Sequence, residues 1–290
     1  MSLRGADLYA EAITEATVQI AKFPEYIAVF GGALTSGGEA SRNAAYKSQR
    51  DFFVRWARSN RTDLAPLLVT PESYEDWSDF NTYTDLLAFE QDLGYLTSVV
   101  LVFLEGYGAV AELGSFSQIN SLKDRLVVVV YDDRHPKKSF ISLGPLRQLA
   151  NADSSSVCAV PHRDGFSLDE DIDVIMRHID EKRDVGRRKL SFDTQEIQHH
   201  FVAALDIISI LEVANFGDIQ IALKALDIQP SDSRLRQMLF TLNTVGAIDR
   251  RQYGGNIYYF PKLRREPPRV SRRLQLLRRW SHEEVEQVLT

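Results

Sequence analysis

The first 185 residues alternate between short apolar runs and longer segments whose apolar positions recur at helical spacing. The runs short and apolar enough to be buried strands are residues 26–30, 67–69, 99–104, 126–131 and 156–160. The segments with helical spacing are residues 41–59, 85–97, 109–119, 144–149 and 168–183. This alternation predicts an α/β domain over residues 1–185, with a flavodoxin-like, doubly wound, parallel five-stranded sheet. Residues 6–22 also show helical spacing and predict a helix at the N-terminus.

From Phe192 onward the pattern changes to three helices followed by a hairpin. Asp193 or Thr194 is a candidate cap for the first helix, and Ser231 begins the third. The hairpin sequence IDRRQYGGNIYYF carries Gly254-Gly255 as a two-residue turn. Three helices and a hairpin are typical of a small winged helix-turn-helix domain, here over residues 190–263.

Basic side chains gather on this predicted domain and on the tail that follows it over residues 264–290. The third helix is expected to point arginines outward, and the wing to carry more, as in helix-in-groove binding to DNA. The candidate nucleic-acid-binding residues are Arg234, Arg236, Arg250, Arg251, Arg272 and Arg273. Winged helices also dock on proteins, so the sequence leaves both kinds of partner open. Apolar residues of the tail recur on one helical face, and phosphate contact or docking on a partner is favoured there over a membrane surface.

The stretch LVFLEGYGAVAELGSF, residues 101–116, predicts a strand, a glycine-containing turn and a helix. In an open parallel sheet such a turn lies at the carboxyl end of the strand, where these folds bind ligands. We place Glu112 in the first turn of the helix, where free N–H groups and the helix dipole favour a carboxylate. An ionised carboxylate there can act as a nucleophile. The spacing alone fits an ordinary first-turn residue equally well.

Charge, cysteine content and apolar runs exclude several classes of protein for this chain. The 290 residues include 40 acidic and 34 basic side chains, so the chain as a whole is not a general polyanion binder. Its single cysteine, Cys158, excludes a disulfide framework and suits a reducing cytosol. We expect no membrane span, no metal and no resident cofactor, because the sequence shows no long apolar run and no metal-ligand spacing. The expected location is the cytoplasm.

At the central stretch the residues resemble a known family. The string EGYGAVAELGSF resembles the active-site motif of nucleoside deoxyribosyltransferase-like domains, in which a Gly-x-x-x-Glu-Leu-Gly turn presents a nucleophilic Glu. The resemblance extends to FGGAL, TPE, KKSFISLGPLRQL and SSSV along the chain. Together with the winged helix, this combination resembles the effector proteins of retron antiphage systems.

The resemblance implies a set of site residues. Glu112 matches the nucleophile, Glu105 the acidic position before the first Gly of the motif, and Glu90 the acid of the preceding helix. Glu105 stands where deoxyribosyltransferases usually have Asp. The glycines of the two turns, Gly31, Gly32 and Gly108, are the candidate substrate-binding positions.

The resemblance also implies a function: a toxic effector that cleaves the N-glycosidic bond of a nucleotide, with NAD the favoured substrate. The implied partners are a reverse transcriptase and its RNA-linked single-stranded DNA. A homo-oligomer is a further state that the sequence leaves open. The alternative is a nucleotide-sensing, DNA-binding regulator that does not turn its ligand over.

Overall fold

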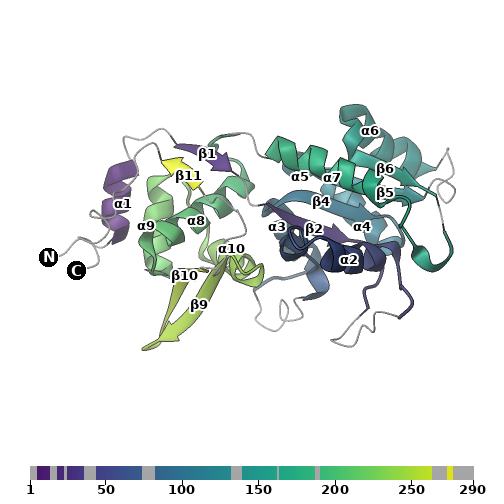
Figure 1. The fold of residues 1–290 in the computed structure, drawn as a ribbon. Helices are drawn as coiled ribbons and strands as arrows, with labels where there is room; N and C mark the ends of the chain where they lie inside the picture. The colour runs from purple at the N-terminus through teal and green to yellow at the C-terminus, as the bar shows by residue number, and fades with distance from the viewer. Residues whose placement is uncertain are drawn as a thin grey trace. The chain divides into compact units, whose positions relative to one another are not determined.

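The computed structural model describes residues 5–13, 18–22, 25–35, 44–73, 82–131, 139–161, 163–186, 190–262 and 273–276. The chain divides into two compact units, whose elements are labelled in Figure 1. The sheet unit comprises residues 25–74 and 97–186, and the C-terminal unit comprises residues 1–24, 75–96 and 187–290.

The sheet unit is built on five parallel strands in the order β3-β2-β4-β5-β6. They are β2 (Tyr26–Phe30), β3 (Leu68–Val69), β4 (Thr97–Phe103), β5 (Leu126–Tyr131) and β6 (Val157–Val160). Every residue of β2, β4 and β5 is buried, as expected for apolar strands covered on both faces. This strand order confirms the predicted flavodoxin-like, doubly wound sheet.

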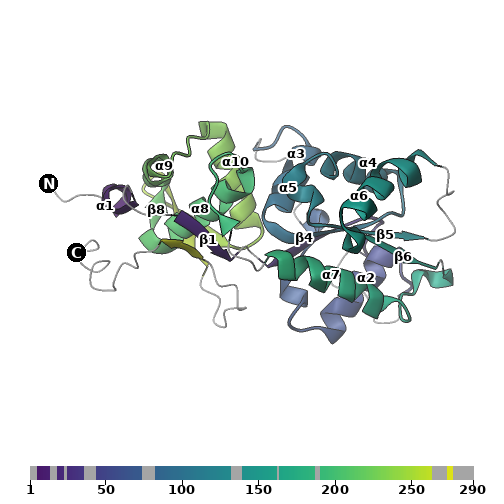
Figure 2. The same ribbon diagram turned by 90° about the horizontal axis from the view of Figure 1, so that it is seen from above.

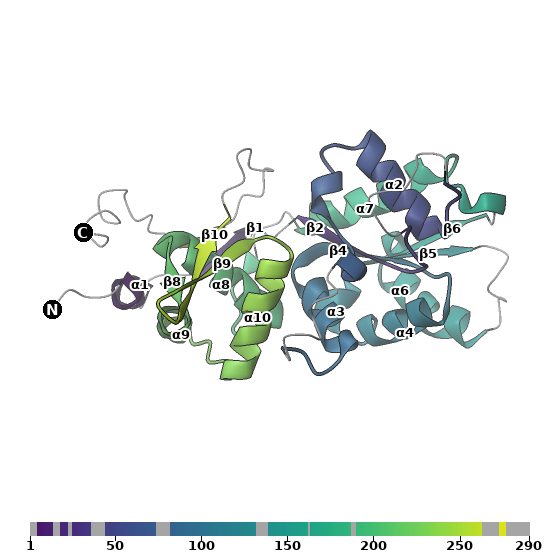
Figure 3. The ribbon, with the colours of Figure 1, turned by 90° about the horizontal axis from the view of Figure 1, so that it is seen from below.

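Helices cover both faces of this sheet (Figures 2 and 3). The helices α2 (Gln49–Asn60) and α7 (Ile172–Gly186) lie on one face, and α4 (Tyr107–Phe116) and α6 (Arg147–Ala152) lie on the other. On the first face Phe53 and Ile175 belong to one buried cluster with strand residues such as Phe103. On the second, Phe30 and Phe116 meet edge to face with ring centroids 5.0 Å apart. The remaining short elements of the unit are η1 (Ala65–Leu67), η2 (Pro71–Ser73), α5 (Asn120–Lys123), η4 (Ser142–Leu146), η5 (Ser154–Ser156) and η6 (Asp164–Phe166).

The strand order fixes where a ligand would bind. The chain runs from β2 outward to β3 and then returns to β4 on the other side of β2, so β2 and β4 flank the point where the winding reverses. In open α/β sheets the crevice at the carboxyl ends of two such strands is the usual ligand site. In this chain those ends carry Gly31 after β2 and Glu105 after β4.

The C-terminal unit contains the expected three helices and hairpin. In chain order they are α8 (Ile197–Leu211), β8 (Ala214–Asn215), α9 (Phe216–Ala225), α10 (Asp232–Thr244), β9 (Ile248–Tyr253) and β10 (Asn256–Pro261). The three strands form an antiparallel sheet in the order β8-β10-β9. Ser231 caps α10 by accepting a hydrogen bond from the Arg234 backbone N–H at 3.2 Å. The first helix instead begins after Glu196, so neither Asp193 nor Thr194 is its cap.

The two ends of the chain differ from the expected helices. Residues 6–22 form α1 (Gly5–Ile13) and then a strand, β1 (Val18–Lys22), which pairs with β7 (Leu190–Ser191) and with β11 (Arg273–Leu276). Residues 18–20 and 273–276 alternate polar and apolar side chains, and this two-residue period favours strand pairing over a helix.

The two units also divide the chain differently from the expected boundary at residue 185. Residues 1–24 and 75–96 group with the C-terminal unit, and the second segment contains α3 (Leu86–Tyr95). Aromatic packing explains this for α3: Phe89 lies 6.1 Å from Phe240 of α10, and Tyr95 stacks 6.5 Å from Phe201 of α8, ring centroid to centroid. None of the helices that the structure describes has both the length and the apolar character needed to span a membrane.

Candidate functional site

Glu105 joins three segments at the carboxyl edge of the sheet. Its carboxylate accepts hydrogen bonds from the backbone N–H groups of Gln49 at 2.6 Å, Gly32 at 3.1 Å and Arg50 at 3.3 Å. Gln49 and Arg50 begin α2, where backbone N–H groups lack partners within the helix. Burial raises the pKa of the Glu105 carboxyl above its ordinary value even though these three bonds act to lower it. Both carboxylate oxygens of Glu105 therefore accept hydrogen bonds from backbone N–H groups. In this way Glu105 fixes the turn after β2 and the start of α2 to the end of β4.

The turn after β2 requires glycine at both of its positions, for backbone conformation at Gly31 and for close packing at Gly32. Gly31 has a φ of +136°, a conformation that L side chains rarely adopt. A Cβ on Gly32 would lie 2.6 Å from the Ser48 Cβ and 2.8 Å from the Glu105 Oε2. The N–H of Gly32 donates to the Glu105 carboxylate. The assignment of Gly31 and Gly32 as substrate-binding positions stays a prediction.

The loop after this turn is fixed by Asp51, one residue beyond Arg50 on α2. Its carboxylate accepts hydrogen bonds from the Thr35 hydroxyl at 2.7 Å, from the Thr35 N–H at 3.1 Å and from the Lys47 N–H at 3.1 Å. Burial alone would raise the pKa of Asp51, but the bonds from Thr35 and Lys47 hold it below its ordinary value. Asp51 is therefore a second structural carboxylate beside Glu105.

Glu112 lies in the second turn of α4, and its expected place in the first turn is wrong. The helix begins at Tyr107, because the extended Gly106 is its N-cap and the next residues are already helical. The Oε2 atom of Glu112 is buried and has no hydrogen-bond partner in the described part of the chain. Burial raises its pKa to about 7, the positive charge of Arg50 opposes this rise, and the negative charge of Glu72 adds to it. The sequence suggested that the helix dipole favours the ionised form of this acid. In the structure burial has the larger effect, and the pKa of Glu112 lies near neutral pH.

Arg50 is a site residue that the sequence reasoning missed. Its side chain is 1% exposed, and its guanidinium donates to the Val29 carbonyl at 2.6 Å and to the carboxylate of Glu72. A signal was present, because Arg50 precedes Phe53, Val54 and Ala57 at the spacing of one helix face, and all three are buried. A cation buried on an apolar helix face requires hydrogen-bond acceptors or a carboxylate as partners.

The structure places two further candidates without testing their roles. Glu90 is a buried residue of α3 and belongs to the C-terminal unit, whereas Glu105 and Glu112 belong to the sheet unit. Gly108 lies in the first turn of α4, where a Cβ would meet nothing within 4 Å. Their catalytic and substrate-binding assignments stay predictions. Among the described residues, no group of three or more His, Cys, Asp or Glu side chains is arranged to hold a metal ion.

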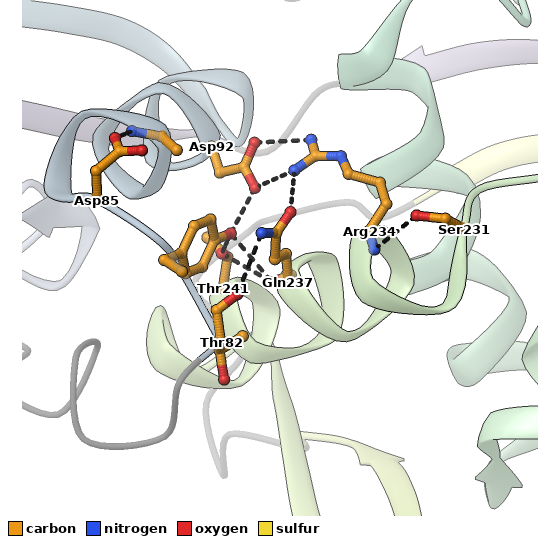
Figure 4. A network of polar contacts seen from close by, with 9 residues as sticks. Thr82, Asp85, Asp92, Ser231, Arg234, Gln237 and Thr241 are labelled. Atoms are coloured by element: carbon orange, nitrogen blue, oxygen red, sulfur yellow. Dashed lines mark hydrogen bonds and ion pairs between the residues drawn. The ribbon is translucent and has the colours of Figure 1, made fainter.

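Arg234 does not point outward for DNA as expected. Its Nη1 and Nη2 atoms lie 2.5 Å and 2.7 Å from the two carboxylate oxygens of Asp92 on α3 (Figure 4). The Tyr83 hydroxyl also donates to Asp92, and the Gln237 amide donates to the Thr82 carbonyl at 3.1 Å. A buried carboxylate such as Asp92 requires a cation and further hydrogen bonds. The guanidinium fork of Arg234 is therefore used inside the C-terminal unit.

The other basic candidates fall into three groups. Arg251 pairs with Asp249 of its own strand at 3.2 Å. Arg236 and Arg250 are exposed, and the guanidinium carbon of Arg236 lies 4.7 Å from the ring centroid of Phe216. Burial raises the pKa of the Tyr259 hydroxyl, and the positive charges of Arg250 and Arg236 act to lower it. Arg272 lies outside the described residues, and Arg273 is described as part of the β11 backbone.

Replacement of Gly32 by Ala tests the packing of the glycine turn. Because the added Cβ would collide with Ser48 and Glu105, we expect the free energy of unfolding to fall by about 1–3 kcal/mol. Urea denaturation followed by circular dichroism measures it. The matched control is Gly114→Ala in α4, where a Cβ meets nothing within 4 Å and helix propensity should add about 0.5–1 kcal/mol. Equal stabilities of the two variants would contradict the close approach.

Replacement of Glu112 by Gln tests the burial of its carboxyl. The folded-state pKa of about 7 lies above the ordinary value of 4.5 for a Glu carboxyl. The stability that depends on the proton is therefore complete below about pH 4.5 and is lost as pH rises through 7. We expect Glu112→Gln to match the wild type in stability near pH 5. Near pH 8 the variant should melt at a higher temperature than the wild type, and its free energy of unfolding should be larger by at most about 3 kcal/mol. Thermal melts at the two pH values decide it, and a variant less stable than wild type at the higher pH would contradict the burial.

Comparison with known proteins gives matches over the sheet unit and beyond it. A family model described as "STM3845 retron effector protein" matches residues 46–250. The "Retron Ec86 putative ribosyltransferase/DNA-binding protein" of Escherichia coli is 27% identical over 121 residues, which cover 42% of this chain and 38% of that protein. The "Retron Ec73 putative ribosyltransferase/DNA-binding protein" of the same organism is 30% identical over 125 residues, which cover 43% of this chain and 38% of that protein.

The family match covers most of the chain, and it includes Arg50, Glu72, Glu105 and Glu112 together with α8, α9 and α10. The alignments with the two curated relatives span well under half of those proteins' lengths. The chain belongs to the STM3845 retron effector family.

Proposed function

We propose that this chain is an effector enzyme that cleaves the N-glycosidic bond of a nucleotide, with Glu112 as nucleophile and NAD as the favoured substrate. The observation that carries the proposal is the buried, unpartnered Oε2 of Glu112, within the part of the chain that the structure describes. Its helix follows β4, one of the two strands that flank the reversal in the sheet. The ribosyltransferase names of the two relatives support the same class of reaction.

The chemistry needs one ionised carboxylate close to the anomeric carbon. In the proposed reaction a Glu112 oxygen attacks C1′ of the ribose as the bond from C1′ to the pyridinium nitrogen breaks. The electron pair of that bond goes to the nitrogen, so nicotinamide leaves as a neutral molecule and needs no proton. Water then attacks C1′ of the glycosyl ester, which frees Glu112 and releases one proton. The positive charge that develops on the sugar is stabilised by the same carboxylate.

The other acids take supporting roles in this proposal. Glu105 is a positioning residue, because its oxygens accept three backbone hydrogen bonds and hold the turn after β2. For Glu90 we keep the proposed role of orienting the substrate. The proposed partners are a retron reverse transcriptase and its RNA-linked single-stranded DNA, an expectation supported by membership of a retron effector family.

The decisive variant is Glu112→Gln, which keeps the shape of the side chain and removes its charge. We expect NAD cleavage, followed as nicotinamide release by chromatography, to fall by about a thousandfold or more. In the wild type kcat/KM should rise with pH up to about 7 and then level off, because the nucleophile must be ionised. The assay uses the full chain, alone and with the proposed partners. Glu181→Gln, an exposed acid of α7, is the matched control and should keep full activity.

The same assay separates the enzyme from the alternative regulator. A nucleotide sensor would bind NAD without releasing nicotinamide, and Glu112→Gln would change neither outcome. Equal nicotinamide release by wild type and Glu112→Gln would show that Glu112 is not the nucleophile.

We propose nucleic-acid contact as a second function, carried by Arg236 and Arg250 on α10 and β9. Both are exposed, and within the described residues neither is paired with a carboxylate. Arg234 and Arg251 each pair with an aspartate, so they are less available to phosphates. The arginines of residues 264–290 remain candidates for the same contact.

Charge reversal of both residues, Arg236→Glu with Arg250→Glu, tests this contact. We expect binding of the full chain to single-stranded DNA to weaken, and the slope of log Kd against log salt to shrink by about 0.7 per lost phosphate contact. The control reverses two exposed arginines of the sheet unit, Arg58→Glu with Arg177→Glu. Fluorescence anisotropy across a salt series measures both proteins. An effect of the same size in the control would show that the binding depends on overall charge and not on these two arginines. No effect in the test protein would show that DNA binds through the tail, or that this unit docks on a protein instead.

A further inference from the structure

The hairpin of β9 and β10 has an outer face directed away from the buried core of the C-terminal unit (Figure 1). Side chains alternate between the two faces of a strand, and the register places Ile248 and Tyr259 on one face. Both of these side chains are buried, so their face packs inside the unit. The outer face is formed by Asp249, Arg251 and Tyr253 of β9 and by Asn256, Tyr258 and Phe260 of β10.

Three of these six side chains are aromatic rings that solvent can reach. Tyr253, beside the glycine turn, is 61% exposed, and Tyr258 and Phe260 are half-buried. Tyr253 pairs with Asn256, two residues before Tyr258, so the two tyrosines are diagonal neighbours. Such neighbours are about 7–8 Å apart on one sheet face. Single exposed rings are common on protein surfaces, whereas a group of them on one face indicates a binding surface.

The cations of the hairpin lie on its edge strand, because β9 is the outer strand of the sheet β8-β10-β9. Arg251 is paired with Tyr258 in the register, and its guanidinium carbon lies 5.4 Å from the ring centroid of Phe260. The Arg251 side chain is 59% exposed even though it pairs with Asp249 at 3.2 Å. Arg250 is exposed on the other face of the same edge. Two arginines and one aspartate give the hairpin a net charge of +1.

Rings on the central strand and cations on the edge strand fit the chemistry of a single strand of nucleic acid. Unpaired bases stack on aromatic side chains, and the phosphates of the same strand contact cations beside them. The positive charge of the hairpin is complementary to those phosphates. In a duplex the faces of the bases are covered by their neighbours, so a duplex can use the arginines but not the rings.

We propose that the outer face of the hairpin binds unpaired bases of a single-stranded nucleic acid, with Tyr253 and Tyr258 as the stacking residues and Arg251 beside them. The inference rests on the proposed nucleic-acid contact and deepens it. Arg236 and Arg250 supply contact with phosphates, and the outer face supplies the preference for single strands. The ligand is an unpaired base on a phosphate backbone, which both DNA and RNA provide.

The test measures binding of the full chain to a short oligonucleotide that contains 2-aminopurine, a fluorescent base whose emission is quenched when it stacks. We expect the wild type to quench the probe. Tyr253→Ala with Tyr258→Ala should abolish quenching and weaken binding about fivefold or more. The slope of log Kd against log salt should stay unchanged, because no phosphate contact is lost.

Two further variants separate stacking from a structural effect. Tyr253→Phe keeps the ring and should quench like the wild type. Tyr107→Ala removes a fully exposed tyrosine from α4 of the sheet unit, so it is the matched control and should bind like the wild type. If the double variant does not fold, Tyr253→Ala decides alone, because Tyr253 is exposed and lies outside the core.

Single-stranded DNA, single-stranded RNA and duplex DNA of one sequence are compared in the same assay. Weaker binding of one or both single strands by the tyrosine variant, with duplex binding unchanged, supports the inference and identifies which nucleic acid is bound. Equal quenching by wild type and Tyr253→Ala, or an equal loss on duplex DNA, would overturn it.

The arginine variants tell this failure from that of the proposed contact. If Arg236→Glu with Arg250→Glu weakens binding while the tyrosine variant does not, the phosphate contact stands and the stacking face is rejected. The reverse result rejects the phosphate contact and supports the stacking face. Absence of binding to all three nucleic acids would overturn both and favour a protein as the partner of this unit.

Discussion

The site depends on one interaction, the acceptance of three backbone hydrogen bonds by the carboxylate of Glu105. Those bonds hold the turn after β2 and the first residues of α2 against the end of β4. Because α2 begins at this contact, the position of Arg50 depends on it as well. Arg50 in turn grips Val29 and Gly32, so the strand end, the turn and the helix start form a closed set of contacts. These contacts join three segments at the carboxyl edge of the sheet, where β2 and β4 flank the reversal of winding.

Two carboxylates seven residues apart, Glu105 and Glu112, have different surroundings, and the roles that we propose for them differ for that reason. Burial raises the pKa of both, but Glu105 has three donors and Glu112 has a buried oxygen without one among the described residues. An unpartnered buried carboxyl lowers stability when it ionises, and such a cost is typical of a functional position. Pairs of titratable groups whose environments differ in this way are how one site obtains a structural acid and a reactive one.

The fold could be predicted from the sequence because apolar strands and amphipathic helices alternate with clear periods, and the strand order followed from that pattern. The details of the site could not. The start of α4 depended on Gly106, which moved Glu112 from the first turn to the second. Arg50 lay on an apolar helix face, and its partner Glu72 is known only from the folded chain. Pairing of β1 with β11 joins residues more than 250 positions apart, which no local period reveals.

Arg234 shows how packing redistributes a basic surface. The sequence of α10 taken alone suggests that both Arg234 and Arg236 face solvent. It cannot reveal that α3, about 140 residues earlier, packs against this helix. Arg234 forms an ion pair with the buried Asp92. Arg236, about 200° further around α10, stays exposed beside Phe216. Packing against α3 and the proposed contact with phosphates thus use different faces of α10, so the first does not exclude the second. Since α3 runs through Leu96 directly into β4, the helix held by Arg234 is covalently joined to the strand that precedes Glu105.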